Sequence, residues 1–218
     1  MHLQRSLKVT VLSDSRSWIN EYIPDIILVI KSWGHHVTWI HRASEITHGD
    51  IVLLLGCGQI IPKNILVKNK HNLVVHESAL PHGRGWSPLT WQILEGKNEI
   101  PITLFEAGES VDSGVIYLQD IMKFSGTELV QELRQKQAEY TKKLCLSFIK
   151  DYPEIAKKGR KQSGLTTYYR RRQPKDSCLD PDKTLREQFS LFRVVDNDNY
   201  PALFEINGVK YILKIEKG

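Results

Sequence analysis

One segment, from His76 to Pro88, carries the highest density of residues that could do chemistry. It joins a short apolar run to a segment with helical spacing, and it packs polar residues such as Ser78 and Arg84 among glycines and prolines. A loop between a strand and a helix can direct side chains and backbone N–H groups into a cleft. From these residues alone, an ordinary loop with a half-buried structural His76 is an equally good interpretation.

A second polar segment, residues 106–114, joins two further apolar runs and contains Asp112 followed by Ser113 and Gly114. Taken alone, an aspartate before Ser-Gly is more often a turn or capping residue than a catalytic one. An imidazole and a carboxylate at the same sheet edge would nevertheless form a pair suited to general acid–base chemistry. We therefore predict that His76 and Asp112 act together.

The elements that must position these loops alternate between apolar runs and segments with helical spacing. Strands are expected at residues 7–12, 36–40, 51–55, 73–76, 100–105 and 115–118. This alternation predicts an α/β fold with a Rossmann-like, mostly parallel sheet and helices on both faces. Such sheets bind ligands beyond the carboxyl ends of their strands, where both polar segments would lie.

Helices are expected between these strands. The first spans the apolar residues from Trp18 to Trp33, starts late or kinks at Pro24, and is capped by Gly34. A second begins at Ser87-Pro88 and runs to Leu94. A third follows a capping box of Ser125 and Glu128, presents one apolar stripe from residue 129 to residue 148, and ends near residues 151–153.

The last 60 or so residues follow a different pattern. Residues 157–164 are basic and contain glycine, which predicts a linker. Further on, two apolar runs flank Asn207-Gly208, a strong hairpin signal. We therefore expect a catalytic domain over residues 1–156 and a small C-terminal α+β subdomain, a helix and a β-hairpin, over residues 157–218.

The composition is that of a globular protein, with 41% hydrophobic and 25% charged residues in 218. No run approaches the roughly 18 apolar residues of a membrane span, and the N-terminus lacks the apolar segment of a signal peptide, so we expect a cytoplasmic protein. The three cysteines and His35-His36 show no metal-ligand spacing, so no metal is expected. The net charge of +5 favours anionic partners. We interpret the basic runs 157–161 and 170–172 as solvated surface.

The two polar segments resemble the signature motifs of the formyltransferase family, which includes methionyl-tRNA, glycinamide ribonucleotide and sugar-nucleotide formyltransferases. The family pattern is Asn-x-His-x-Ser-Leu-Leu-Pro-x-x-Arg-Gly, followed by Val-Asp-x-Gly-x-Ile. The matching residues are His76, Ser78, Leu80, Pro81, Arg84 and Gly85, and then residues 111–116. Asp112 follows His76 by 36 residues, the usual family interval, and residues 58–62 resemble a third family segment. The resemblance covers about residues 7–149.

This resemblance implies that a formyl group moves from N10-formyltetrahydrofolate to an amine. His76 would donate to the formyl oxygen, while Asp112 would orient His76 and accept the amine proton, directly or through water. The implied cofactor-binding residues are Gln59, Ile60, Ile61, Ala107, Gly108, Val111 and Asp112, and the implied substrate-binding residues are Ser78, Arg84, Gly85 and Trp86. Arg84 would meet an acceptor phosphate or carboxylate, or else stabilise its loop by pairing with Glu77 or a carbonyl.

One departure from the family concerns the Asn two residues before the His, which is Val74 here. That Asn helps to hold the tetrahedral intermediate, and Val cannot donate a hydrogen bond. Asn72 lies on the same strand face, but ~6–7 Å further along. Either His76 and backbone N–H groups carry the oxyanion alone, or another side chain substitutes, or the protein is inactive. We favour the first, because losing one oxyanion donor costs about 10²–10³ in rate.

The C-terminal residues resemble the tail of sugar N-formyltransferases, with Arg171, Arg172, Pro174 and Asp176 in the pattern Arg-Arg-x-Pro-x-Asp. The resemblance therefore implies an amino-sugar acceptor, either a nucleotide-linked 4-amino-4,6-dideoxyhexose or a nonulosonic acid such as a pseudaminic acid precursor. Such sugars belong to lipopolysaccharide, O-antigen and other surface glycans. It also implies a homodimer through the C-terminal subdomain. The alternatives are an acceptor on methionyl-tRNA or a peptide, which the short tail disfavours, and a non-catalytic folate- or sugar-binding module.

Overall fold

A computed structural model of the chain, which describes residues 5–108 and 110–218, has a six-stranded central sheet in the order β2-β1-β3-β4-β6-β7. The strands are β1 (Lys8–Leu12), β2 (His36–Ile40), β3 (Gly49–Leu54), β4 (Asn69–His76), β6 (Glu99–Glu106) and β7 (Ile116–Lys123). Strands β1 to β4 pair in parallel, whereas β6 runs antiparallel to both of its neighbours. The prediction of a mostly parallel sheet in an α/β fold is confirmed.

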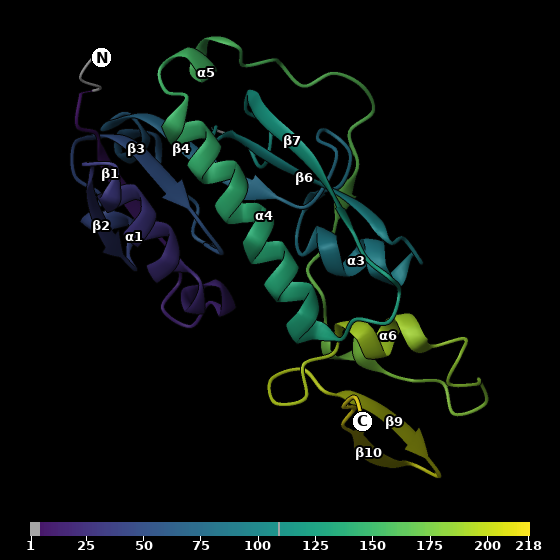
Figure 1. The fold of residues 1–218 in the computed structure, drawn as a ribbon. Helices are drawn as coiled ribbons and strands as arrows, with labels where there is room; N and C mark the ends of the chain where they lie inside the picture. Colours follow the sequence, from purple (N-terminus) through teal and green to yellow (C-terminus); the bar gives the residue numbers. More distant parts are fainter. Residues whose placement is uncertain (1–4, 109) are drawn as a thin grey trace.

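Helices cover the two faces of the sheet unequally. The helices α1 (Ile23–Ser32) and α4 (Val130–Lys150) lie over one face, and α4 crosses it diagonally (Figure 1). Within residues 5–108 and 110–218, the helical segments packed on the other face are the short helix α2 (Lys63–Leu66) and the 3-10 turn Ala43–Glu45. Because side chains alternate along a strand, Leu53 packs on the side of α1 and α4, and its neighbours Val52 and Leu54 pack on the opposite side.

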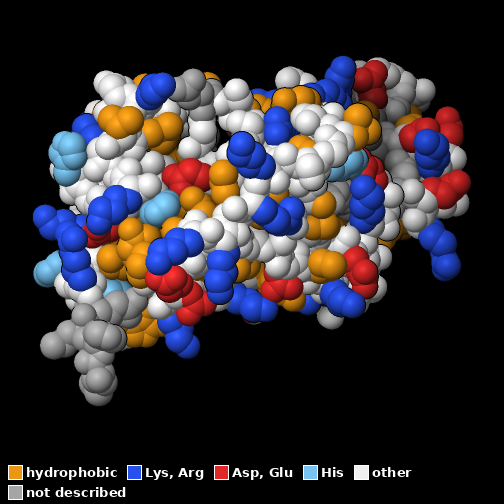
Figure 2. Space-filling model, turned by 90° about the horizontal axis from the view of Figure 1, so that it is seen from above, with side chains coloured by type: hydrophobic (Ala, Val, Ile, Leu, Met, Phe, Trp, Pro, Cys, Tyr) orange, Lys and Arg blue, Asp and Glu red, His pale blue; other side chains and the backbone are white. Residues whose placement is uncertain are grey.

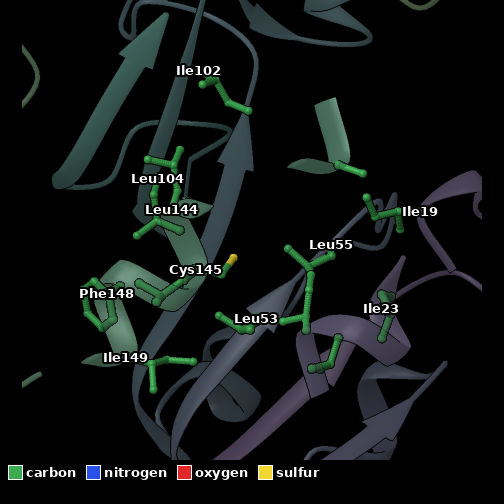
Figure 3. Close-up of a cluster of buried hydrophobic side chains, with 14 of the residues drawn as sticks. Ile19, Ile23, Leu53, Leu55, Ile102, Leu104, Leu144, Cys145, Phe148 and Ile149 are labelled. Atoms are coloured by element: carbon green, nitrogen blue, oxygen red, sulfur yellow. The ribbon is translucent and has the colours of Figure 1, made fainter. Parts of the chain in front are cut away.

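The main core lies between α4, α1 and the sheet. Figure 3 shows Leu144, Cys145, Phe148 and Ile149 projecting from α4 toward Leu53, Leu55, Ile102 and Leu104. All eight of these side chains are buried. The apolar stripe predicted for this helix is therefore the surface that attaches it to the sheet, and burial of that surface is the main force holding the two layers together.

The start of α1 agrees with the sequence-based prediction. Residues 18–21 form a 3-10 turn, and the α-helix begins at Ile23 with Pro24 in its first turn. Proline is tolerated there because the first N–H groups of a helix have no partner within the helix. The helix α3 (Pro88–Leu94) also begins at the predicted proline, at the end of the loop that contains Arg84 and Gly85.

The start of α4 differs from the prediction. Ser125 and Glu128 do hydrogen-bond, with the Ser125 N–H donating to Glu128 Oε1 at 2.5 Å, but they close a turn and not the helix. Gly126 has a φ of +97°, which is incompatible with a helix. The helix begins at Val130 instead, where the Glu132 carboxylate accepts the N–H of Leu129 at 2.9 Å.

The remaining elements belong to the last 65 residues and to one loop. They are α5 (Glu154–Lys157), the paired short strands β5 (Arg84–Gly85) and β8 (Tyr168–Tyr169), the 3-10 turn Pro174–Ser177, α6 (Phe189–Val194), and the strands β9 (Ala202–Ile206) and β10 (Val209–Leu213). The predicted hairpin is present: Asn207 and Gly208, both with positive φ, connect β9 to β10. Figure 1 shows this hairpin at the end of the molecule, beyond α6. The division near residue 156 stays a prediction.

An ion pair between a buried arginine and a partly buried glutamate joins α6 to the main core. Arg193 is 3% exposed, donates to Asn98 Oδ1 at 2.8 Å and pairs with Glu128 Oε2 at 3.1 Å. Burial acts to raise the pKa of Glu128, but hydrogen bonds from Ser125 and from backbone N–H groups outweigh it and lower this pKa to about 2. The carboxylate is therefore ionised wherever the protein is folded near neutral pH, and it needs the guanidinium.

We expect Arg193→Met to destabilise the fold by about 1–3 kcal/mol, because it leaves the partly buried Glu128 carboxylate without its counterion and Asn98 Oδ1 without its donor. Chemical denaturation of the purified variant would measure this loss. The matched control is Lys214→Met, which removes the exposed ion pair with Asp198 and should cost less than ~1 kcal/mol. Equal stability losses in the two variants would contradict a structural role for the Arg193 pair.

Candidate active site

A cleft of about 800 Å³ lies beyond the carboxyl ends of β3 and β4, as the parallel topology predicts. It is lined by the segment after β1, the loop after β3, the end of β4, the loop before α3 with the first turn of α3, the loop between β6 and β7, and one face of α4. Residues 171–174, Ser177, Val194, Asp196 and Tyr200 from the C-terminal part also line it. The cleft is therefore formed by segments that are far apart in the sequence.

His76 and Asp112 meet in this cleft. His76 is the last residue of β4 and is 6% exposed, and its Nε2 lies 3.7 Å from Asp112 Oδ2. The same Nε2 lies 2.8 Å from the carbonyl oxygen of Gly83. Because a carbonyl oxygen can only accept, Nε2 carries a proton in this arrangement. The histidine thus presents an N–H donor beside a carboxylate, which is the pair that the sequence predicts.

Asp112 adopts a backbone conformation that requires support. Its φ is +50°, in the left-handed region that costs an L-residue about 1 kcal/mol. Its Oδ2 accepts the N–H of Gly85 at 2.8 Å, and its carbonyl oxygen accepts Gln162 Nε2 at 2.8 Å. Gln162 Nε2 also donates to the Gly114 carbonyl at 2.9 Å. These contacts hold the side chain and the backbone of Asp112 from two sides.

The loop before α3 is held by main-chain pairing with the C-terminal part. The N–H of Gly83 donates to Thr167 Oγ1 at 2.8 Å, and the N–H of Arg84 donates to the Thr167 carbonyl at 2.9 Å. Gly85 has a φ of +98°, and a Cβ there would lie 2.4 Å from the Tyr169 carbonyl oxygen, so only glycine fits. Residues 160–169 therefore support both of the loops that carry His76's neighbours and Asp112, which the prediction of a linker over residues 157–164 did not include.

The residues that the family resemblance assigns to the cofactor all line the cleft: Gln59, Ile60, Ile61, Ala107, Gly108, Val111 and Asp112. Ile60 and Val111 are 86% and 55% exposed, so apolar surface is uncovered there. Gln59 Nε2 donates to Asp14 Oδ1 at 2.8 Å, which fixes the loop after β3. Glu109, which belongs to the polar segment 106–114, lies outside the residues that the structure describes.

The residues assigned to the substrate divide into two groups. Gly85 and Trp86 line the cleft, whereas Ser78 and Arg84 do not. Ser78 is 1% exposed. The Arg84 guanidinium turns to Gln162 Oε1 at 2.6 Å and to the Tyr168 hydroxyl at 3.5 Å. Its acceptor is the side-chain carbonyl of Gln162 and not Glu77, an arrangement of the kind that the loop-stabilising alternative describes.

The sequence analysis did not assign several of the residues that line the cleft to a site. Glu77 is 8% exposed, accepts Gln137 Nε2 at 2.6 Å, and has a pKa raised by burial. Arg134, Gln137 and Thr141 place polar groups of α4 in the lining. These three residues are spaced three and four positions apart, which places them on one side of the helix. This spacing could have identified a polar stripe, but the sequence analysis identified the helix only from its apolar stripe.

Val74 also lines the cleft, where it packs with Leu80 and Phe105. Asn72 does not substitute for a donor at this position, because its Nδ2 donates to the Leu66 carbonyl at 3.0 Å. The sequence analysis named three kinds of hydrogen-bond donor for the formyl oxygen: His76, backbone N–H groups and a substituting side chain such as Asn72. With the Asn72 amide engaged, His76 and backbone N–H groups remain.

Thiol chemistry does not fit this cleft. Cys57 lines it, but burial raises the pKa of its thiol to about 11, so the thiolate is scarce at neutral pH.

Within residues 5–108 and 110–218, no three His, Cys, Asp or Glu side chains gather as metal ligands would. The same residues include no helix long and apolar enough to cross a membrane.

Comparison with known proteins gives related sequences over most of the catalytic part. Residues 31–149 match the family model described as "Formyl transferase". A methionyl-tRNA formyltransferase from Prochlorococcus marinus is 33% identical over 117 residues, which are 53% of this chain and 33% of that protein. One from Caldicellulosiruptor saccharolyticus is 28% identical over 169 residues, or 77% and 53% of the two chains. The chain thus matches only a third to about half of the length of these relatives.

Solved structures share the fold along almost the whole chain. A methionyl-tRNA formyltransferase from Clostridium thermocellum has a TM-score of 0.79 at 22% identity, covering 96% of this chain and 92% of that one. A sugar N-formyltransferase from Shewanella has 0.68 at 17%, covering 97% and 98%. HypX from Aquifex aeolicus in complex with tetrahydrofolic acid has 0.75 at 14%, covering 97% and 38%. At these identities the likeness establishes the fold alone.

We expect Gln162→Ala to loosen the loop between β6 and β7, because it removes two donations to backbone carbonyls and the partner of Arg84. Hydrogen exchange at residues 110–115 should accelerate while the core strands stay protected, and the stability loss should be about 1–3 kcal/mol. The matched control is Gln135→Ala, whose amide contacts only exposed Glu139. Unchanged exchange in the loop of the Gln162 variant would contradict this support.

Proposed function

The chain belongs to the formyl transferase family, and on that premise we propose that it transfers a formyl group from N10-formyltetrahydrofolate to the amine of an amino sugar. The observation that carries the proposal is the buried pair of His76 Nε2 and Asp112 Oδ2, 3.7 Å apart in a cleft beyond the end of β4. Formyl transfer needs a donor for the oxygen that gains negative charge and an acceptor for the amine proton. This pair offers one of each.

The co-substrate, when bound, supplies an activated formyl carbon. His76 Nε2–H, which now donates to Gly83, would turn to the formyl oxygen as the amine adds to that carbon. Asp112, as a carboxylate, would accept the proton that the amine loses, directly or through water. Asp112 would then return that proton, directly or through water, to the nitrogen that leaves the formyl carbon, which balances the transfer. Because Val74 cannot donate and the Asn72 amide is engaged by Leu66, His76 would share the oxygen with backbone N–H groups.

The lining fits a folate at the loops after β3 and β6. Ile60 and Val111 expose apolar surface on two sides of this region, as a flat, largely apolar ring system requires. Gly108, between them in the lining, keeps side-chain bulk low. Asp14 is engaged by Gly58 and Gln59, at 2.8 Å each, so this wall is fixed before a ligand arrives.

An amino-sugar acceptor is supported by the polar face of α4. Arg134, Gln137 and Thr141 line the cleft together with Glu77, and sugar hydroxyls need such a set of donors and acceptors. We propose a nucleotide-linked 4-amino-4,6-dideoxyhexose or a nonulosonic acid precursor of a surface glycan. Among proteins of similar fold, the Shewanella enzyme is a sugar N-formyltransferase.

A second candidate acceptor is an aminoacyl-tRNA, because the curated relatives at 27–33% identity are methionyl-tRNA formyltransferases. The net charge of +5 is compatible with it. On the face shown in Figure 2, Lys and Arg side chains are interspersed with acidic and apolar ones and do not form one continuous patch. The sugar acceptor is therefore tested first.

His76→Ala and Asp112→Asn should each lower formyl transfer by at least ~10²-fold while leaving the fold intact. Release of tetrahydrofolate, followed by absorbance with a panel of nucleotide-linked amino sugars, would measure this. Circular dichroism of each variant controls for folding. Either folded variant turning over near the wild-type rate would remove that residue from the mechanism.

The same panel separates the acceptors. Turnover with a sugar supports the proposal, and turnover with initiator methionyl-tRNA alone would replace it with the second candidate. Binding of folate without turnover on any acceptor would favour a non-catalytic module, the outcome that Val74 would explain.

We also propose a homodimer formed through the β9–β10 hairpin, because it exposes apolar side chains. Val209 is 52% exposed and Ile212 is 65% exposed. Light scattering at micromolar concentration should give a dimer for the wild type and a monomer for Ile212→Asp, because a buried unpaired charge disfavours an apolar interface. A monomeric wild type would end this proposal.

A further inference from the structure

Glu77 is a buried titratable residue that lines the cleft next to His76. It is 8% exposed. Its carboxylate accepts the side-chain amide of Gln137, on α4, at 2.6 Å, and its backbone carbonyl accepts the side-chain amide of Gln92, on α3, at 2.6 Å. Both donors are neutral, so they fix Glu77 in the cleft without neutralising a charge on its carboxylate.

Glu77 and His76 reach the cleft from opposite faces of the sheet. Successive side chains of an extended chain point to opposite sides. His76 packs edge-on against the Phe105 ring, with the centroids 6.4 Å apart, whereas Glu77 contacts Gln137 of α4, which covers the other face. Asp112 lines the same cleft, 3.7 Å from His76. Two carboxylates and one imidazole therefore line the space beyond the end of β4.

The other acidic residues of the lining are engaged by the protein itself. Asp14 accepts hydrogen bonds from the loop after β3 with both of its carboxylate oxygens, at 2.8 Å each. Asp196 pairs with Arg134 at 3.0 Å and also accepts two backbone N–H groups at 3.1 Å. Among the described residues that line the cleft, Glu77 and Asp112 are therefore the carboxylates that remain for proton transfer.

Formyl transfer removes two protons from an amine that arrives as an ammonium group, which is the main form of a primary amine near neutral pH. The first proton must leave before the nitrogen attacks, because an ammonium group has no free electron pair. The second leaves as the new carbon–nitrogen bond forms, and Asp112 accepts it and returns it to the leaving nitrogen. Since Asp112 must be unprotonated when the amine adds, the first proton needs a different acceptor.

We propose that Glu77 is this acceptor and is thus a second catalytic carboxylate of the site. An N–H bond of the ammonium group breaks, its electron pair stays on the nitrogen, and the proton forms an O–H bond on Glu77. Glu77 releases that proton to water after each turnover, which accounts for the one proton that the overall reaction sets free. The inference rests on the proposed formyl transfer, and it holds for a sugar amine and an aminoacyl amine alike.

The groups around Glu77 favour this role. Burial raises the pKa of its carboxyl and the negative charge of Asp112 acts in the same direction, whereas the charge of His76 and the donation from α4 oppose them. The pKa is therefore raised toward that of an amine, which makes the carboxylate a better base. The charged residue of the α4 lining, Arg134, is paired with Asp196, and α3 contributes a neutral amide.

Glu77→Gln keeps the size of the side chain and an oxygen for Gln137, but it cannot take up a proton. With the acceptor that turns over, whether amino sugar or methionyl-tRNA, we expect kcat/KM near neutral pH to fall about 10²-fold. The variant depends on acceptor molecules that are already uncharged, so its deficit should shrink about tenfold for each pH unit until the amine is deprotonated in solution. A purely structural defect would lower the rate by the same factor at every pH. The matched control is Glu99→Gln, which changes an exposed carboxylate outside the cleft lining and should match the wild type.

A measurement without acceptor tests the Glu77 carboxyl itself. In carbon-13 NMR of the full chain labelled at its glutamate carboxyls, the signals missing from Glu77→Gln and Glu99→Gln identify the two residues. The titration midpoint of Glu77 should lie above that of Glu99 and below the pH of turnover, so that the group is ionised when the amine binds. Asp112→Asn should lower this midpoint, because the charge of Asp112 raises the pKa of Glu77.

Three results would overturn the inference: a deficit of Glu77→Gln that does not change with pH, wild-type turnover by this variant near neutral pH, or a Glu77 midpoint that equals that of Glu99 or exceeds the pH of turnover. If Glu77→Gln does not fold, Gln137→Leu replaces it, because the lost donation raises the pKa of Glu77. This variant must raise the midpoint of one glutamate signal and shift the acidic limb of the pH–rate profile by the same amount. A chain that transfers a formyl group to no acceptor would contradict the proposed function and the role of Glu77 together, whereas turnover with any of the three results contradicts the role of Glu77 alone.

Discussion

The conformation of Asp112 is the constraint on which the site depends. The positive φ of Asp112 is unfavourable for an L-residue, so the local sequence does not stabilise it. The contacts that other segments make with Asp112 must therefore hold this conformation. The backbone N–H of Gly85 donates to the Asp112 carboxylate, and the side-chain amide of Gln162 donates to the Asp112 carbonyl. Because Gln162 also binds Arg84, the two loops and the C-terminal part form one hydrogen-bonded unit. The distance between His76 and Asp112 is set by that unit and not by the sheet alone.

The sheet, in turn, determines where that unit can form. Burial of one face of α4 against β3 and β6 fixes the layers, and the parallel strands then end together at one edge. The polar residues of α4 reach the cleft only because the apolar residues of the same helix are buried. Glu77 follows His76 directly, which places the imidazole and the Glu77–Gln137 contact at the same strand end.

Local patterns predicted the elements well where periodicity was clear. The sheet strands, the late start of α1 at Pro24 and the hairpin at Asn207-Gly208 follow from residue preferences acting over a few positions. Ser125 and Glu128 show the limit of such patterns, because their capping-box contact forms and yet the positive φ of Gly126 prevents a helix there. His76 and Asp112 were found because both belong to motifs at a fixed interval.

The rest of the site could not be read from the sequence because it depends on contacts between distant segments. Nothing local distinguishes Arg84, which turns to Gln162, from Arg172, which lines the cleft. Residues 157–164 have the composition of a linker, yet Gln162 supports the loop that contains Asp112. For Arg84 and for Gln162, the partner lies 78 and 50 residues away in the chain, beyond the reach of any periodicity.

The main-chain pairing of residues 84–85 with residues 168–169 also affects the order in which the molecule can become functional. During synthesis, the sheet and α4 can assemble once residue 150 has emerged from the ribosome. The loop before α3 then still lacks its neighbouring strand, and Asp112 lacks Gln162. The nascent chain would therefore hold a folded core around an unfinished cleft, and the loops of the cleft would gain their support only when residues 160–172 have docked.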